Sequence, residues 1–105
     1  MLILHLLSQK EMYGYELSQI IKEVSNDMLI IPEGSLYPAL YKLEDKGYVK
    51  EDRRLIGKRR QRSYYIIQPA GLERLQLLLE EYHNIQNALE AVLQYTTGEE
   101  TDEEN

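Results

Sequence analysis

The feature that constrains this chain most is a long, proline-free stretch near its C-terminus. From Ala70 to about Tyr95 the only glycine is Gly71, and apolar side chains recur in steps of three and four residues. The members of this heptad seam are Leu75, Leu78, Tyr82, Ile85, Leu89 and Val92. A helix of about 25 residues is about 37 Å long, and the rest of a 105-residue chain is too small to cover such a stripe. A second protomer is the simplest cover, so the seam predicts a homodimer.

The remaining sequence predicts three shorter helices before a β-hairpin. Residues 1–7 are apolar and suffice for one or two helical turns. Residues 13–24 and 33–46 each repeat the spacing of one apolar helix face. The side chains on these two faces are Leu17, Ile20, Ile21 and Val24, and then Leu36, Leu40 and Leu43. We expect Ser35 to be the N-cap of the later helix, with Pro38 in its first turn, where proline is tolerated.

The charged residues are segregated along the chain. Twelve basic and eighteen acidic residues give a net charge of −6, but residues 53–62 hold six bases and no acid. These bases are Arg53, Arg54, Lys58, Arg59, Arg60 and Arg62. The last seven residues, 99–105, contain five acids and no base. Because the local field decides whether a phosphate backbone is attracted, the net charge does not exclude nucleic acid as a partner.

The basic segment lies at the connection of a predicted hairpin. Residues 48–55 and 62–67 are rich in Tyr, Val and Ile, and Gly57 lies between them. Helices followed by a hairpin with a positive tip predict an α+β, mainly α fold: a winged helix-turn-helix with a long C-terminal dimerisation helix. The expected divisions are a winged helix-turn-helix domain at 1–68, the dimerisation helix at 69–95 and an acidic, disordered tail at 96–105. We expect the acidic tail to limit non-specific binding to DNA, because like charges repel.

The composition argues against several other classes of function. Without cysteine the chain has no disulfide, thiolate zinc site or cysteine nucleophile. No apolar run approaches the roughly 20 residues that span a bilayer, and we see no signal peptide, so we expect a cytoplasmic protein without a membrane partner. No serine–histidine–aspartate arrangement, phosphate loop or pair of buried carboxylates stands out, so neither an enzyme nor a cofactor is expected. Glu80 and His83 have the i, i+3 spacing of di-iron helices, but the seam beside them is leucine, so we expect no metal site.

Several short motifs resemble those of a known family. Tyr-Gly-Tyr-Glu-Leu at residues 13–17 is followed by Gly-Ser-Leu-Tyr-Pro-Ala-Leu at residues 34–40. Further matching positions are Leu43, Glu44, Gly47, Arg62, Tyr64, Tyr65, Pro69, Ala70 and Gly71. Together they resemble the PadR family of bacterial transcriptional regulators, and the single long C-terminal helix is similar to that of its shorter subfamily. The resemblance implies a dimeric winged-helix repressor that binds double-stranded DNA and, in some members, responds to small aromatic or drug-like ligands.

The chain departs from the family pattern at three places. The first helix of the family usually begins earlier than the one predicted here. Ser35 stands where threonine is usual, which keeps the hydroxyl group. Pro69 stands where threonine is frequent, and proline suits the start of a helix.

The helix over residues 33–46 and the hairpin tip supply the candidate DNA contacts. Gly34 allows close approach, Ser35 can bond to a phosphate or a base edge, and Pro38 can contact a thymine methyl group. Arginine in the hairpin suits both phosphate and a narrow minor groove. The predicted DNA-binding set is Tyr15, Gly34, Ser35, Tyr37, Pro38, Tyr41, Lys42, Lys58, Arg59, Arg60 and Arg62. The alternatives are an ordinary amphipathic surface helix, a solvated charged loop, or RNA or an anionic membrane surface as the partner.

Tyr82 is the candidate ligand contact. It lies in the middle of the seam, where two copies could approach across a dimer axis, and in some relatives an aromatic residue near this position stacks flat ligands. The alternative is a tyrosine that only packs in the dimer interface. Two other functions remain open: a small-molecule sensor whose key event is ligand capture at the seam, and a protein-interaction module on the same scaffold.

Overall fold

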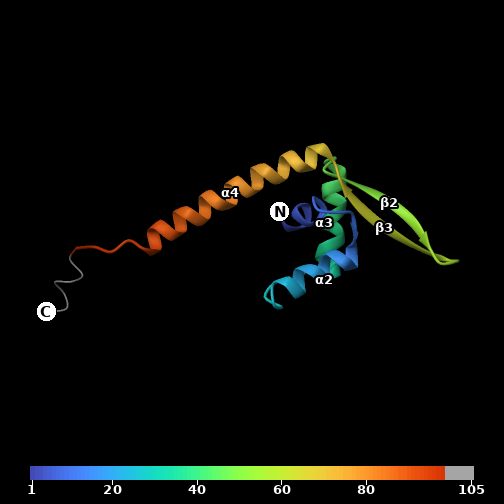
Figure 1. The fold of residues 1–105 in the computed structure, drawn as a ribbon, viewed down its shortest axis with the longest axis horizontal. Helices are drawn as coiled ribbons and strands as arrows, with labels where there is room; N and C mark the ends of the chain where they lie inside the picture. Colours follow the sequence, from blue (N-terminus) through green and yellow to red (C-terminus); the bar gives the residue numbers. More distant parts are fainter. Residues whose placement is uncertain (99–105) are drawn as a thin grey trace.

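The computed structural model describes residues 1–98 and contains the expected helices and hairpin in the expected order, together with one additional short strand. These are α1 (Leu2–Leu7), β1 (Met12–Tyr13), α2 (Gly14–Val24), α3 (Glu33–Asp45), β2 (Val49–Ile56), β3 (Arg60–Ile67) and α4 (Pro69–Leu93). Three helices and a small antiparallel sheet form a body, from which the hairpin and α4 extend in opposite directions (Figure 1). The predicted fold class is therefore confirmed. Residues 99–105 of the predicted acidic tail lie outside the described residues.

The helix-turn-helix is formed by α2 and α3. The apolar face of α2 buries Leu17 and Ile21. After Ser25 the chain reverses through Asn26 and Asp27, which have positive φ angles of 54° and 64°. Asparagine and aspartate tolerate this left-handed conformation better than other non-glycine residues, so α2 ends here and the chain turns toward α3.

The cap of α3 differs from the prediction, although the helix begins at Glu33, where its predicted range also begins. Pro32 is the N-cap residue, and its carbonyl oxygen accepts hydrogen bonds from the N–H groups of Ser35 and Leu36, both at 2.9 Å. The prediction that Ser35 caps the helix is therefore wrong, because its own N–H already belongs to the first turn. Pro38 consequently lies inside α3 rather than in its first turn. Since proline has no N–H, the carbonyl of Gly34 lacks its usual i→i+4 partner.

The hairpin is the wing of the fold. β2 and β3 pair from Val49↔Ile67 to Ile56↔Arg60, which leaves a three-residue connection at 57–59. Gly57 has a φ of 74°, a conformation that glycine adopts without steric cost. The hairpin prediction is confirmed, although the ladder runs farther than expected and includes Arg60.

The third strand, β1, was not expected from the sequence. Its two residues pair with β3 through Met12↔Tyr65 and Tyr13↔Tyr64, so the sheet order is β1-β3-β2. Two residues are too short to show the alternation that identifies a strand in sequence. β1 matters because it places the residue before α2 against the middle of the wing.

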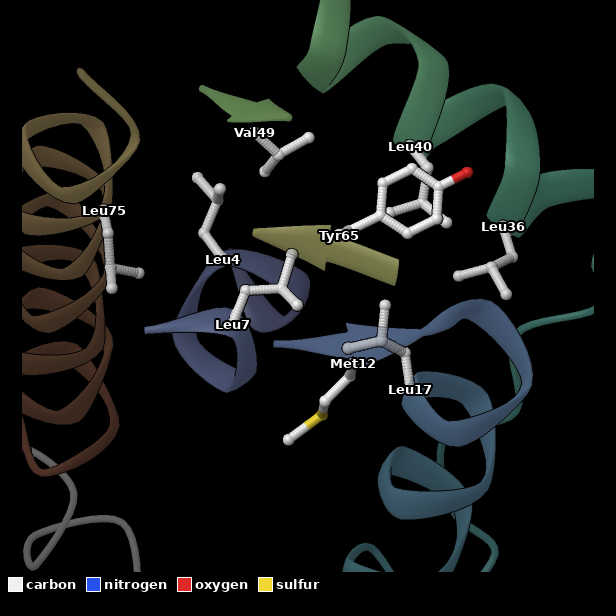
Figure 2. Packing of buried hydrophobic residues seen from close by; sticks show 9 residues of the cluster. All are labelled: Leu4, Leu7, Met12, Leu17, Leu36, Leu40, Val49, Tyr65 and Leu75. Atoms are coloured by element: carbon white, nitrogen blue, oxygen red, sulfur yellow. The ribbon is translucent and has the colours of Figure 1, made fainter. Parts of the chain in front are cut away.

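The hydrophobic core joins the helices to the base of the wing (Figure 2). Its buried members are Leu4, Leu7, Met12, Leu17, Leu36, Leu40, Val49, Tyr65 and Leu75. The ring of Tyr65 lies between α1, α2 and α3, and its burial raises the pKa of its hydroxyl to about 12. The core thus fixes α3 and β3, the two elements that carry most of the candidate contacts, relative to each other.

The last helix, α4, begins against the base of the wing and then leaves the body. The N–H of Gln68 donates to the carbonyl oxygen of Tyr48 at 2.9 Å. A Cβ atom on Gly71 would overlap the same oxygen, so the close approach requires glycine. The described chain extends 77 Å along its longest axis. Among residues 1–98, no helix has both the length and the apolar character that a membrane crossing requires.

Candidate nucleic-acid interface

The outward face of α3 carries the predicted DNA contacts. Leu36 and Leu40 are buried in the core. Between and around them, Gly34, Ser35, Pro38, Tyr41 and Lys42 are not buried. A Cβ atom on Gly34 would meet nothing within 4 Å. The space beside Gly34 is therefore open, and a DNA groove can approach the backbone of the N-terminal part of α3 closely.

Tyr37 is held differently from the other residues of this face. It is half-buried, and its ring packs against the first residue of α2: a Cβ atom on Gly14 would come within 2.6 Å of the Tyr37 hydroxyl oxygen. Its ring centroid lies 6.4 Å from that of Tyr41. Tyr37 therefore joins α2 to α3 in addition to its predicted role. Tyr15, in the first turn of α2, is exposed.

The tip of the wing is a cluster of unneutralised cations. Lys58, Arg59 and Arg60 are all exposed. In the part of the chain that the structure describes, none of the three forms an ion pair. Their charges are thus available to an anionic partner.

The paired strands of the wing just below the tip are different, because their arginines have internal partners. Arg54 donates from Nη2 to Oε2 of Glu11 at 2.7 Å and from Nε to Oδ2 of Asp52 at 3.0 Å. Its guanidinium carbon also lies 4.2 Å from the ring centroid of Tyr64. The hydrogen bond from Arg54 lowers the pKa of the Glu11 carboxyl group. The Nε atom of Arg53 lies 3.6 Å from Oε2 of Glu51, within the range of an ion pair.

The count of charges within residues 53–62 therefore overstated the positive charge that this segment presents. Three carboxylates from outside the segment, those of Glu11, Glu51 and Asp52, form ion pairs with Arg53 and Arg54. Sequence counting missed the first of them because Glu11 precedes Arg54 by 43 residues and reaches it only through the fold.

Arg62 projects from β3 over the ring of Tyr13. The distance from its guanidinium carbon to the ring centroid is 3.9 Å, which is typical of a cation–π contact. The rings of Tyr13 and Tyr64 meet edge-to-face, with centroids 5.4 Å apart and an interplanar angle of 75°. No ion pair of Arg62 occurs within residues 1–98, so its N–H groups remain available to an external acceptor.

An open cleft of about 510 Å³ lies between the wing and the helix-turn-helix. Tyr15 and Tyr37 line it on the helical side, and Arg60 and Arg62 line it on the wing side. Four residues predicted separately from the sequence are thus brought to one hollow. Such a cleft, with cations and hydroxyl groups on its walls, is suited to a sugar–phosphate backbone.

The heptad seam of α4 is divided by the structure. Leu75 is only 6% exposed, since it packs into the core of its own protomer. This burial leaves Leu75 little surface to offer to a partner protomer. Leu78 is half-buried, whereas four later seam residues are exposed: Tyr82, Ile85, Leu89 and Val92.

Tyr82 also borders a second cavity, of about 390 Å³, between α4 and α1. Leu2, His5, Leu29 and Leu79 are among the other residues that line it. The lining of the cavity is mostly apolar. Among the described residues, no group of three or more His, Cys, Asp or Glu side chains could hold a metal ion.

Comparisons with known proteins match both the sequence and the fold. Residues 3–77 match the Transcriptional regulator PadR-like family. An uncharacterized protein of Lysinibacillus sphaericus is 29% identical over 93 residues, which cover 89% of this chain and 85% of that protein. The family match extends over the whole helix-turn-helix, the wing and the start of α4.

Solved structures are also similar to the chain, and three of them illustrate the likeness. A transcriptional regulator from Clostridium thermocellum has a TM-score of 0.80 and 32% identity, over 86% of this chain and 87% of that one. A PadR family transcription regulator from Clostridium difficile has a TM-score of 0.77 and 27% identity, over 88% and 94%. Bacillus subtilis PadR, in complex with operator DNA, has a TM-score of 0.69 and 27% identity, over 73% and 44%.

Proposed function

The chain belongs to the PadR-like family of transcriptional regulators, and we propose that it represses transcription by binding a palindromic operator as a homodimer. One observation carries this proposal: a single open cleft is lined by Tyr15 and Tyr37 from the helix-turn-helix and by Arg60 and Arg62 from the wing. Families of transcriptional regulators are generally not enzymes, and we propose no catalytic role.

In this proposal α3 enters the major groove with its N-terminal part. Gly34 permits close approach, Ser35 donates to a phosphate or a base edge, and Pro38 contacts a thymine methyl group. Tyr15, Tyr41 and Lys42 contact the backbone beside the groove. The wing contributes Lys58, Arg59, Arg60 and Arg62, whose charges release counterions from the phosphates.

The exposed part of α4 supplies the proposed dimer interface. The interface residues are Leu78, Tyr82, Ile85, Leu89 and Val92, without Leu75. We divide the chain into a DNA-binding unit at 1–68 and a dimerisation helix at 69–95. The two reading heads then lie about one helical turn apart, near 34 Å, as a compact palindrome requires.

Ligand-dependent release is a second proposed function, favoured by the cavity beside Tyr82. A small aromatic molecule that stacks on Tyr82 and prefers one spacing of the heads shifts DNA affinity by its differential binding. Tyr82→Ala should then weaken ligand binding and spare DNA binding in the ligand-free protein.

Fluorescence anisotropy with labelled duplex DNA from the region upstream of the coding sequence tests the main proposal. We expect affinity to fall many-fold between about 50 and 200 mM salt, and to survive an excess of random duplex. Reversing the charge of Arg59 and Arg60 should abolish binding. Absence of binding at low salt, or indifference to that charge reversal, would favour a protein-interaction module instead.

A further inference from the structure

One face of the sheet, between the core and the tip of the wing, carries a continuous row of aromatic and cationic side chains. Tyr13 pairs with Tyr64 across β1 and β3, and Arg62 pairs with Arg54 across β3 and β2. Directly paired residues in an antiparallel sheet share a face, as do residues two apart on one strand. The four side chains therefore lie on one face, and contacts run from Arg62 to Tyr13, from Tyr13 to Tyr64 and from Tyr64 to Arg54. We name this row the Arg–Tyr stack.

The two ends of the Arg–Tyr stack are both arginines, but they differ in whether nearby carboxylates balance the charge. At one end the charge of Arg54 is balanced by Glu11 and Asp52, and the resulting network fixes its guanidinium beside Tyr64. At the other end the one contact of the Arg62 guanidinium among residues 1–98 is with the ring face of Tyr13, and Arg62 borders the cleft. A ring face restrains a guanidinium without using its N–H groups, so Arg62 is held in place and still able to donate.

We propose that Tyr13 is a positioning residue for DNA binding: its ring holds the guanidinium of Arg62 in the cleft between the wing and α2, where Arg62 donates to a phosphate of the DNA backbone. Tyr13 acts through Arg62 and makes no decisive contact of its own. The inference rests on the proposed function, and it gives β1 a role beyond the burial of Met12: its pairing with β3 sets the ring of Tyr13 beside Arg62.

Four variants test the proposal without altering the charge at Tyr13: Tyr13→Leu, Tyr13→Phe, Arg62→Gln and the double variant Tyr13→Leu/Arg62→Gln. The probe is a labelled duplex of mixed sequence, about three helical turns long, because phosphate contacts do not depend on sequence. Binding is measured by anisotropy across a series of salt concentrations. Arg53→Gln, on the opposite face of β2, controls for the loss of one positive charge near the wing.

We expect Arg62→Gln to weaken binding about tenfold and to reduce the slope of log affinity against log salt by about one. Tyr13→Leu should weaken binding about threefold, whereas Tyr13→Phe, which keeps the ring face, should stay within about twofold of the unaltered protein. In the Arg62→Gln background, Tyr13→Leu should cost nothing further, since positions that act through one contact are not additive.

Three results would overturn the inference while leaving the proposed function standing: full affinity in Tyr13→Leu, an equal loss in Tyr13→Phe, or an undiminished loss in the Arg62→Gln background. The last result would mean that Tyr13 only supports the fold, because a structural defect weakens binding in either background. If the unaltered protein bound neither the mixed-sequence duplex nor the upstream duplex, both the inference and the proposed function would be overturned.

Discussion

The two halves of α4 carry the same apolar pattern but lie in different surroundings. In the first half, Gly71 and Leu75 are buried against α1 and the base of the wing, and Leu79 packs against the core. In the second half, Leu89 and Val92 are 60% and 72% exposed. The difference teaches that a heptad pattern identifies the helix and its apolar side but not what covers that side.

The reason for the division is geometric. The body is small, and α4 projects away from it (Figure 1). The apolar side chains beyond Leu79 therefore have little surface of their own protomer to pack against. Variants that act on one half alone should separate the stability of the protomer from its assembly.

The largest expected effect falls on the second half. Leu89→Asp places a carboxylate from each protomer in the proposed interface, and we expect the dimer dissociation constant to rise about 1,000-fold, equal to about 4 kcal/mol. The protomer itself should stay folded, because Leu89 is exposed within it. Sedimentation equilibrium measures the assembly, and circular dichroism monitors the fold. Asn87→Asp, which adds the same charge at an exposed position two residues away on the other side of α4, is the matched control; an unchanged dimer in Leu89→Asp would remove the seam from the interface.

The next largest effect falls on the start of the first half. In Gly71→Ala the new methyl group would overlap the backbone carbonyl of Tyr48, which cannot move as a flexible side chain can. We expect a loss of about 3 kcal/mol in the free energy of unfolding, from overpacking and from strain on the Gln68–Tyr48 hydrogen bond. Urea unfolding at fixed protein concentration measures it. Gly34→Ala, at an open position in α3, should lose nothing, and equal midpoints for the two variants would contradict the close approach.

A smaller loss is expected from the seam residue that is buried within its own protomer. Leu75→Ala removes a buried side chain at the edge of the core, and we expect a cost of about 2 kcal/mol in unfolding free energy, at the low end for such changes. Leu72→Ala, one helical turn earlier and 46% exposed, should cost less than half as much. If Leu75→Ala instead weakened the dimer and spared the protomer, the original assignment of Leu75 to the interface would be restored.

Local patterns predicted most of the elements, whereas long-range contacts could not be predicted. The spacing of Leu36 and Leu40 and the glycine at Gly57 were sufficient for α3 and the hairpin, because helix faces and turns are encoded by neighbouring residues. The N-cap of α3 was misplaced because serine is a preferred N-cap residue, although the predicted range of the helix already began directly after Pro32.

The candidate interface was predicted in its residue types but not in its division of labour. The basic residues of the wing were identified from the sequence, yet only the fold shows that Arg54 is neutralised by Glu11 and Asp52, whereas no acid among residues 1–98 forms an ion pair with Lys58 or Arg59. The strand β1 depends on pairing with β3, much later in the chain, and no local signal announces it. Seam residues at the two ends of α4 look alike in the sequence because burial by the same chain and burial by a partner select the same side chains.

The smallest predicted effect acts on the body alone and is set by pH. The hydrogen bond from Arg54 lowers the pKa of Glu11 in the folded state, so its contribution is fully present above the unfolded pKa of about 4.3. It is lost as the pH falls through the lowered folded pKa. We therefore expect the unaltered protein to exceed Glu11→Gln in Tm by about 1–2 °C at neutral pH, because exposed ion pairs contribute little, and the difference to close in acid, below the lowered pKa. Glu11 contacts Arg54 of the wing and not the second half of α4. The dimer dissociation constants of the two proteins, measured by sedimentation equilibrium, should therefore be equal at each pH. A pH-independent difference in Tm would show that the ion pair of Glu11 is not its source, and a change in assembly in Glu11→Gln would show that the wing and the dimer helix are energetically coupled.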